Sequence, residues 1–252
     1  MSQAPRDTAL PTLFVHGIRT SSSMWRAQLA ALHATGHRAL AIDLPGHGAR
    51  IGEPFTVDAA ITAIDDGVRE LGGRVLLVGL SLGGYFSIEY AARHPHGVAG
   101  LIAASCSTRP RGVGLAGYRG LAAAIKRLPD RGLALNNAMA RLAVGAEGSV
   151  DLGAGGIALE VMDAALSAAG SLDPLAGLAR YPGPVWIVNG KLDHFRVDES
   201  RFVRANPRTR HILIPGATHL VSLVKPERFT AIVLDALHEL EAETHSIVAS
   251  GE

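Results

Sequence analysis

Residues 75–84 read VLLVGLSLGG, and this stretch decides the fold. The continuous apolar run Val75–Leu80 is typical of a strand that is covered on both faces. Leu82–Arg93 has the pattern of a helix, so Ser81 lies on a very short turn between the two elements. Such a turn strains the serine backbone, and the glycines on either side lack the Cβ atoms that would keep strand and helix apart. The G-x-S-x-G pattern in this context predicts a serine hydroxyl that projects from the sheet at a helix N-terminus, where the helix dipole favours a developing anion.

Apolar runs alternate with segments of helical period on both sides of this turn, which indicates βαβ units and a parallel sheet. The expected strands are Thr12–His16, Ala39–Asp43, Val75–Leu80, Val98–Ala104, Val185–Asn189 and His211–Ile214. The expected helices are Ser23–Thr35, Val57–Leu71, Leu82–Arg93, Val197–Ala205 and Pro226–Glu243. We therefore predict an α/β fold, with a mostly parallel sheet of about six strands and helices on both faces.

The strict alternation stops between Ser105 and Pro184, in a stretch rich in Ala, Gly, Leu and Arg. Its pattern predicts a mostly helical insertion, and its many glycines predict that the helices are short. Two interpretations remain open for this insertion. It is either more core, or a lid over the carboxyl ends of the strands, where ligands bind in open α/β sheets.

Composition restricts the class of protein. The 252 residues fit one domain, and hydrophobic residues at 48% with charged residues at 19% are ordinary for a globular chain. A net charge of +1 favours neither a nucleic-acid partner nor a membrane partner. Cys106 is the single cysteine, so no intramolecular disulfide is possible. Met1–Leu10 lacks the apolar core of a secretory signal, and no apolar stretch is long enough to cross a membrane. We expect a soluble, cytoplasmic protein.

No metal or organic cofactor is expected, because no His/Asp/Cys cluster has ligand spacing and no G-x-G-x-x-G opens a helix.

Two further residues are candidates to act with Ser81. Of eleven histidines, His219 best fits a general base, because it follows a predicted strand through the turn 215–218 and so lies at a carboxyl strand end. Asp193 follows the preceding strand in the same way and would hold the imidazole tautomer. Asp198 and Glu199 remain alternatives, although both fall in the following predicted helix.

An acyl-transfer reaction also needs two N–H donors for the oxyanion. The amide of Leu82, directly after the serine, is one candidate, and the amide of Ile18, after His16-Gly17, is the other. His16 itself is interpreted as a residue that pins its loop by a hydrogen bond rather than as the base.

These pieces, in this order along the chain, resemble the α/β-hydrolase superfamily, and the resemblance covers nearly the whole chain. The loop Asp43–Gly48 (DLPGHG) also resembles that family's loop, which implies that His47 is structural. The resemblance further implies a helical cap at about 107–179 within a single domain 1–252. The short start before Thr12 implies a minimal six-stranded sheet, as in plant methylesterases, hydroxynitrile lyases and a menaquinone-pathway synthase. A serine nucleophile, in place of aspartate, argues against dehalogenases and epoxide hydrolases.

The resulting functional prediction is a serine hydrolase of carboxylesterase type (EC 3.1.1), which cleaves an ester or related acyl bond of a small molecule through an acyl-serine. The alternative is a lyase or carbon–carbon bond-cleaving enzyme that uses the triad for proton transfer, and a third possibility is a non-enzymatic binding module. Met24 and Trp25 are expected either to wall the substrate pocket or to pack in the core.

Basic residues predominate in the first part of the predicted cap. Between Ser107 and Glu147 the only acid is Asp130, against seven cations: Arg109, Arg111, Arg119, Lys126, Arg127, Arg131 and Arg141. Such a run is either a solvated face or a site that attracts an anionic substrate or an acyl-carrying partner. If the run attracts an anionic substrate, charge reversal of Arg127 and Arg131 is expected to raise KM for acidic esters and to leave KM for neutral esters unchanged. Equal effects on both kinds of ester would contradict such a site.

Overall fold

The computed structural model describes residues 9–250. Most of the segment in which no secretory signal is expected, residues 1–8, lies outside this range. One sheet of six strands has the order β2-β1-β3-β4-β5-β6, and all neighbouring strands are parallel. The strands are β1 (Thr12–Val15), β2 (Ala39–Ile42), β3 (Val75–Leu80), β4 (Val98–Ala104), β5 (Val185–Gly190) and β6 (Thr209–Ile214). The predicted α/β fold with six strands is confirmed.

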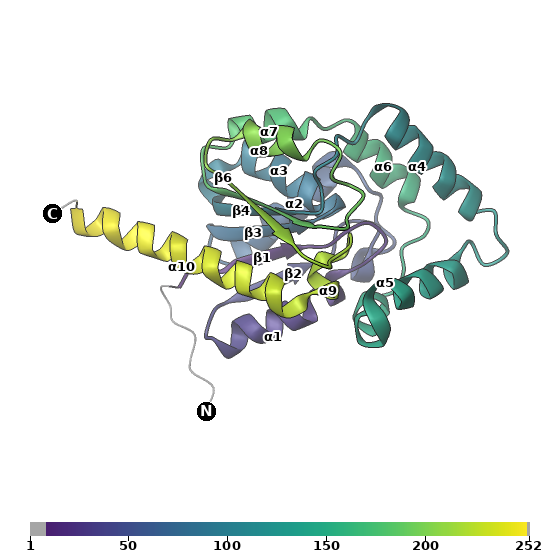
Figure 1. The fold of residues 1–252 in the computed structure, drawn as a ribbon, viewed down its shortest axis with the longest axis horizontal. Helices are drawn as coiled ribbons and strands as arrows, with labels where there is room; N and C mark the ends of the chain where they lie inside the picture. Colours follow the sequence, from purple (N-terminus) through teal and green to yellow (C-terminus); the bar gives the residue numbers. More distant parts are fainter. Residues whose placement is uncertain (1–8, 251–252) are drawn as a thin grey trace.

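Side chains that alternate along the strands build two core layers, one on each face of the sheet. In β1, Leu13 and Val15 belong to one layer and Phe14 to the other. The first layer is covered by α2 (Val57–Glu70), α3 (Leu82–Arg93), α7 (Pro174–Arg180) and α8 (Glu199–Ala205). The second is covered by α1 (Arg26–Ala34), α9 (Val221–Val224) and α10 (Pro226–Ser250) (Figure 1). Helices therefore lie on both faces, as predicted.

A helical cap lies on the side of the sheet toward which the β6 arrow points (Figure 1). It consists of α4 (Gly112–Ile125), α5 (Leu133–Gly153) and α6 (Met162–Gly170), and α5 is broken at Gly145, where φ is 73°. The last part of the expected cap, up to residue 179, includes α7, which packs against α3 and whose Leu178 is completely buried in the first core layer. The cap helices end with α6, at Gly170.

Several helices begin or end at other residues than predicted, in two cases beside a hydrogen bond to a residue that is distant in sequence. The first predicted helix begins instead with a 3₁₀ turn, η1 (Ser22–Trp25), whose Ser22 amide donates to Asp43. The helix predicted from Val197 starts at Glu199, because the Asp198 amide donates to the carbonyl of Ser107. The last helix runs on to Ser250, beyond its predicted end at Glu243. Two more 3₁₀ turns are η2 (Gly48–Arg50) and η3 (Pro95–Gly97). Among the described residues, no helix is long and apolar enough to cross a membrane.

Candidate active site

Ser81 occupies the sharp turn between β3 and α3. Its backbone has φ 55° and ψ −114°, which is a strained conformation for a residue with a side chain, and its amide donates to the carbonyl of Ala104. A Cβ at Gly79 would overlap the carbonyl of Gly83, and a Cβ at Gly83 would overlap the carbonyls of Val15 and His16. The two glycines therefore let α3 start directly against the end of the sheet, with Ser81 at its N-terminus.

His219 and Asp193 meet Ser81 at this edge. The Nε2 atom of His219 lies 3.0 Å from Ser81 Oγ, and its Nδ1 atom lies 3.1 and 3.2 Å from the two carboxylate oxygens of Asp193. Because an ionised carboxylate only accepts hydrogen bonds, Nδ1 carries the proton and Nε2 accepts from the serine hydroxyl. The three side chains form one hydrogen-bonded chain, although they are 138 and 26 residues apart in sequence.

The electrostatics of Asp193 keep it ionised. Its side chain is completely buried, and burial alone raises the pKa of a carboxyl group. The hydrogen bond from His219, the electrostatic attraction of that ring and the amide of Phe195, 2.9 Å away, outweigh burial and hold the pKa of Asp193 below its ordinary value. An anionic Asp193 can therefore stabilise a positive charge that develops on His219.

The loop after β1 comes close to the serine. A Cβ built at Gly17 would lie 3.6 Å from the Cβ of Ser81, so the backbone that precedes Ile18 runs beside the candidate nucleophile. The amide of Leu82, at the first position of α3, has no acceptor within its own helix. The amide of Leu82 thus directly follows Ser81 in the chain, and the loop that leads to Ile18 runs beside the serine.

His16 pins this loop, in agreement with its predicted role. The Leu44 amide donates to Nε2 of His16 at 2.9 Å, so the imidazole carries its proton on Nδ1, which donates to the Gly17 carbonyl at 2.7 Å. Burial, and then the neighbouring His47, lower the pKa of His16 to about 3. A neutral His16 therefore ties the loops after β1 and β2 together. His47 is also buried, and its Nδ1 lies 2.9 Å from the Pro45 carbonyl.

Met24 and Trp25 pack in the core, which is the second of the two roles expected for them, and not against a substrate pocket. Both are completely buried in the second core layer, where the Trp25 ring packs against Phe14 and Phe229 at 4.9 and 5.8 Å. The Sδ atom of Met24 accepts a hydrogen bond from the Thr20 hydroxyl. The 3₁₀ turn η1 directs these large side chains under α10 rather than toward Ser81.

Sequence reasoning missed an aromatic group beside the histidine. The Phe195 ring lies 4.7 Å from the His219 ring, and Tyr118 of α4 meets Phe195 edge-on at 5.8 Å. The His194 ring lies 4.3 Å from Phe195 and 5.8 Å from His219. The only available signal was that Phe195 follows Asp193 by two residues, whereas nothing in the sequence connects Tyr118 with the site.

Most cations of the cap have acidic partners. Arg119 pairs with Asp163, and Lys126 and Arg131 both pair with Glu160. Arg109 pairs with Asp198, and Arg111 lies 3.9 Å from Asp173. These acids follow the basic segment in the sequence, so counting charges within the segment overstated its excess. Arg127 and Arg141 have no ion pair within the described part of the chain and are exposed.

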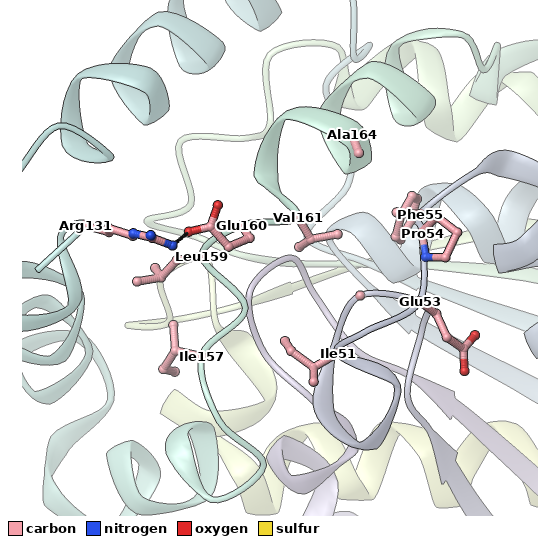
Figure 2. A pocket seen from close by; sticks show the side chains of 11 residues that line it. Ile51, Glu53, Pro54, Phe55, Arg131, Ile157, Leu159, Glu160, Val161 and Ala164 are labelled. Carbon is pink, nitrogen blue, oxygen red and sulfur yellow. Dashed lines mark hydrogen bonds and ion pairs between the residues drawn. The ribbon is translucent and has the colours of Figure 1, made fainter.

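A cavity of about 490 Å³ lies under another part of the cap. The loop after β2 supplies Ile51, Pro54 and Phe55, and the segment between α5 and α6 supplies Ile157, Leu159 and Val161, with the Arg131–Glu160 ion pair at its edge (Figure 2). The cavity shares no lining residue with the Ser81–His219–Asp193 chain. Within residues 9–250, no group of three His, Cys, Asp or Glu side chains could hold a metal ion.

Comparison with known proteins connects this geometry to a family. Residues 12–232 match the model of the alpha/beta hydrolase family. A pimeloyl-[acyl-carrier protein] methyl ester esterase of Aromatoleum aromaticum is 34% identical over 115 residues, which are 44% of this chain and 44% of that protein. A non-heme haloperoxidase of Rhodococcus erythropolis is 37% identical over 94 residues, which are 34% and 33% of the two chains.

A solved structure resembles nearly the whole chain. A thermophilic esterase from Thermogutta terrifontis superposes with a TM-score of 0.77 and 25% identity, over 92% of this chain and 91% of that chain. The curated relatives, by contrast, match this chain over less than half of their own length. Their esterase and haloperoxidase activities are therefore properties of those proteins.

Proposed function

The chain belongs to the alpha/beta hydrolase family, and on that premise we propose that it is a serine esterase that hydrolyses a small-molecule carboxylic ester. Ser81 is the nucleophile, His219 the general base and Asp193 the residue that orients His219. The observation that carries the proposal is the hydrogen-bonded chain from Ser81 Oγ through both imidazole nitrogens to an ionised, buried carboxylate.

The proposed reaction has two halves. His219 Nε2 takes the Ser81 proton as Oγ bonds to the ester carbonyl carbon, and the resulting oxyanion accepts hydrogen bonds from the amides of Ile18 and Leu82. The intermediate collapses to an acyl-serine, and the leaving alcohol takes its proton from Nε2. Water then repeats the attack on the acyl carbon and releases the acid. No bond to a cofactor forms in this sequence.

The test is covalent labelling by a fluorophosphonate, detected by intact mass, on the wild-type protein and Ser81→Ala. A panel of p-nitrophenyl esters of increasing acyl length is measured alongside. We expect one phosphonyl group on the wild-type protein and none on Ser81→Ala, with ester turnover lost in the same variant. A folded wild-type protein that neither reacts with the fluorophosphonate nor hydrolyses any of the esters would contradict the esterase proposal.

The alternative, a lyase or carbon–carbon bond-cleaving enzyme, uses the same histidine without an acyl-serine. The two mechanisms are distinguished by whether an acyl-serine intermediate forms. Rapid acid quench of the wild-type protein with a p-nitrophenyl ester is expected to trap an acyl group on the peptide that contains Ser81. Turnover of the physiological substrate with no trapped acyl group would favour the lyase.

Cap cations that are unpaired among the described residues bear on whether the substrate is anionic. Arg127 and Arg141 are the cap cations without an acidic partner in the described chain, so they are better probes than Arg131, which Glu160 neutralises. If they attract an anionic or acyl-carrying substrate, Arg127→Glu with Arg141→Glu raises KM for an acidic ester and leaves KM for a neutral ester unchanged. Arg228→Glu, exposed on α10 outside the cap, is the matched control. Equal effects on both esters would argue for a solvated face.

A further inference from the structure

An aromatic chain connects the cap to the candidate base. The His219 imidazole packs on Phe195 at 4.7 Å with the rings tilted by 47°, and Phe195 in turn meets Tyr118 at 5.8 Å with the rings at 89°. Tyr118 comes from α4 and Phe195 from the loop that carries Asp193. Two distant segments therefore place aromatic surface beside the one imidazole that the reaction uses.

This surface lies near the leaving group. His219 Nε2 is 3.0 Å from Ser81 Oγ, and the oxygen that it protonates in the first half-reaction must lie about 3 Å from the same nitrogen. The first carbon atoms of the leaving alcohol therefore sit one or two bonds from the imidazole. Aromatic rings attract each other when their centroids are about 4.5–7 Å apart, a distance that a ring on those atoms can reach from Phe195.

Both aromatic residues are suited to contact a ligand. The amide of Phe195 donates to Asp193 Oδ1 at 2.9 Å, which fixes the backbone that carries the ring. Phe195 and Tyr118 are each only partly buried. The Tyr118 hydroxyl makes no hydrogen bond within the described residues, whereas the hydroxyls of Tyr85, Tyr90 and Tyr181 each have an acceptor.

We propose that Phe195 and Tyr118 form a binding subsite for an aromatic ring on the leaving alcohol of the substrate. The subsite rests on the proposed esterase function, because it is defined by the position of the leaving oxygen. It makes esters of benzyl-type alcohols better substrates than esters of saturated alcohols of the same size.

The wild-type protein is tested with benzyl acetate and cyclohexylmethyl acetate. The two esters share the acyl group and a primary leaving alcohol, and they differ in whether the six-membered ring is aromatic. We expect kcat/KM to favour benzyl acetate by about three- to tenfold, the factor that one aromatic pair contributes. A ratio near one, with hydrolysis dependent on Ser81, overturns the subsite and leaves the esterase proposal standing.

Variants assign the preference to the two residues. Tyr118→Leu and Phe195→Leu remove a ring but keep apolar bulk, and each is expected to bring the ratio close to one. Tyr118→Phe keeps the ring and is expected to keep the ratio. Leu142→Ala, on the same cap with a side chain that is 90% exposed, is the matched control and leaves the ratio unchanged. If the leucine variants slow both esters by the same factor, the two rings only position His219 and the subsite is overturned.

Binding gives a test that does not depend on turnover. Dissociation constants of both esters are measured by NMR titration of Ser81→Ala, alone and combined with Tyr118→Leu. We expect Ser81→Ala to bind benzyl acetate more tightly and the double variant to lose that preference. If the wild-type protein hydrolyses neither ester, fluorophosphonate labelling of Ser81 still decides the esterase proposal, and this titration still decides the subsite. Equal binding of the two esters overturns it.

Discussion

The proposed role of Asp193, to orient His219, can be tested by replacing one carboxylate oxygen with an amide nitrogen in Asp193→Asn. Its carboxylate accepts from His219 Nδ1, whereas an amide in its place could donate to Nδ1 and favour the tautomer whose Nε2 cannot take the serine proton. We predict that Asp193→Asn lowers kcat by about 10³–10⁴ with little change in KM. The measurement is steady-state kinetics with the best p-nitrophenyl ester.

Asp198→Asn is the matched control, since Asp198 lies in the same loop and pairs with Arg109 rather than with His219. We expect this variant to lose less than about tenfold in kcat. A larger loss from Asp198→Asn than from Asp193→Asn would mean that Asp198, the alternative left open by the sequence, is the catalytic acid.

Glu199 binds three donors at the end of this loop. Its carboxylate accepts from Asn189 at 2.7 Å and from Arg196 at 2.8 and 2.7 Å, and it lies 3.1 Å from His211. Arg196 also donates to the Lys191 carbonyl, which closes the loop around Asp193. Burial opposes ionisation, but the hydrogen bonds from Arg196, Asn189 and His211 lower the pKa of Glu199 from 4.5 to about 2.

The lowered pKa of Glu199 makes the free energy of unfolding depend on pH. A carboxyl whose pKa falls on folding stabilises the protein fully above its unfolded pKa and loses that contribution as pH falls toward its folded pKa. We predict that Glu199→Gln lowers the free energy of unfolding by about 2 kcal/mol at pH 7. The difference should shrink as pH falls below 4.5 toward 2. Urea unfolding at pH 7 and in steps down to pH 3.5 measures it.

Glu70→Gln, at the exposed end of α2, is the control for Glu199→Gln. It should change the unfolding free energy by less than about 0.5 kcal/mol at every pH of the series. A Glu199→Gln deficit that stays constant across the pH range would contradict the assigned shift.

The turn between β3 and α3 depends on the absence of a side chain at position 83. A Cβ there would overlap two carbonyl oxygens of the β1 end, and backbone atoms cannot give way as a flexible side chain can. We predict that Gly83→Ala lowers the unfolding free energy by about 3 kcal/mol or more, or abolishes folding. Thermal and urea unfolding measure the change.

Gly114→Ala is the matched control within a helix, because a Cβ at Gly114 meets nothing within 4 Å. Alanine exceeds glycine in helix propensity, so this variant is expected to gain about 0.5–1 kcal/mol. A Gly83→Ala protein as stable as the wild type would show that strand and helix can separate at this turn.

The α4–α5 part of the cap exposes much apolar surface. Eleven large hydrophobic side chains of the described chain are exposed, and seven belong to α4, α5 and the turn between them: Leu121, Leu128, Leu133, Leu135, Met139, Leu142 and Val150. Segments with few buried apolar contacts open locally before the whole protein unfolds. For α5, hydrogen bonds to the body are therefore important for its attachment.

Asp151 is the main anchor of α5. Its carboxylate accepts two hydrogen bonds from Arg26, and its carbonyl accepts one from Ser23 at 2.6 Å. We predict that Asp151→Asn raises hydrogen-exchange rates across residues 133–153 several-fold and leaves those of β3 and β4 unchanged. Exchange mass spectrometry at pH 7 is the measurement.

Asp163→Asn removes another cap ion pair, with Arg119, in which the Asp163 side chain is 80% exposed, so we expect no change in exchange from this control. Faster exchange in the sheet as well as the cap after Asp151→Asn would show general destabilisation instead of release of an anchor.

The strands, the turn at Ser81 and the order of the candidate triad could be predicted because they depend on local patterns. An apolar run marks a buried parallel strand wherever it lies, and the glycines at 79 and 83 mark the tight turn by their spacing alone. Parallel strands bring their carboxyl ends to one edge, so Ser81, Asp193 and His219 could be expected to meet although they are far apart in sequence.

Only the tertiary structure decided which side chains surround that edge. Met24 and Trp25 follow the loop beside Ser81, yet the 3₁₀ turn directs them into the core. Glu160 and Asp163 neutralise cap cations that precede them by about thirty to forty residues. Tyr118 reaches Phe195 from a different element. Each of these contacts depends on how α4, α5 and α6 pack against the sheet, and a periodic pattern along one segment carries no information about its distance from another.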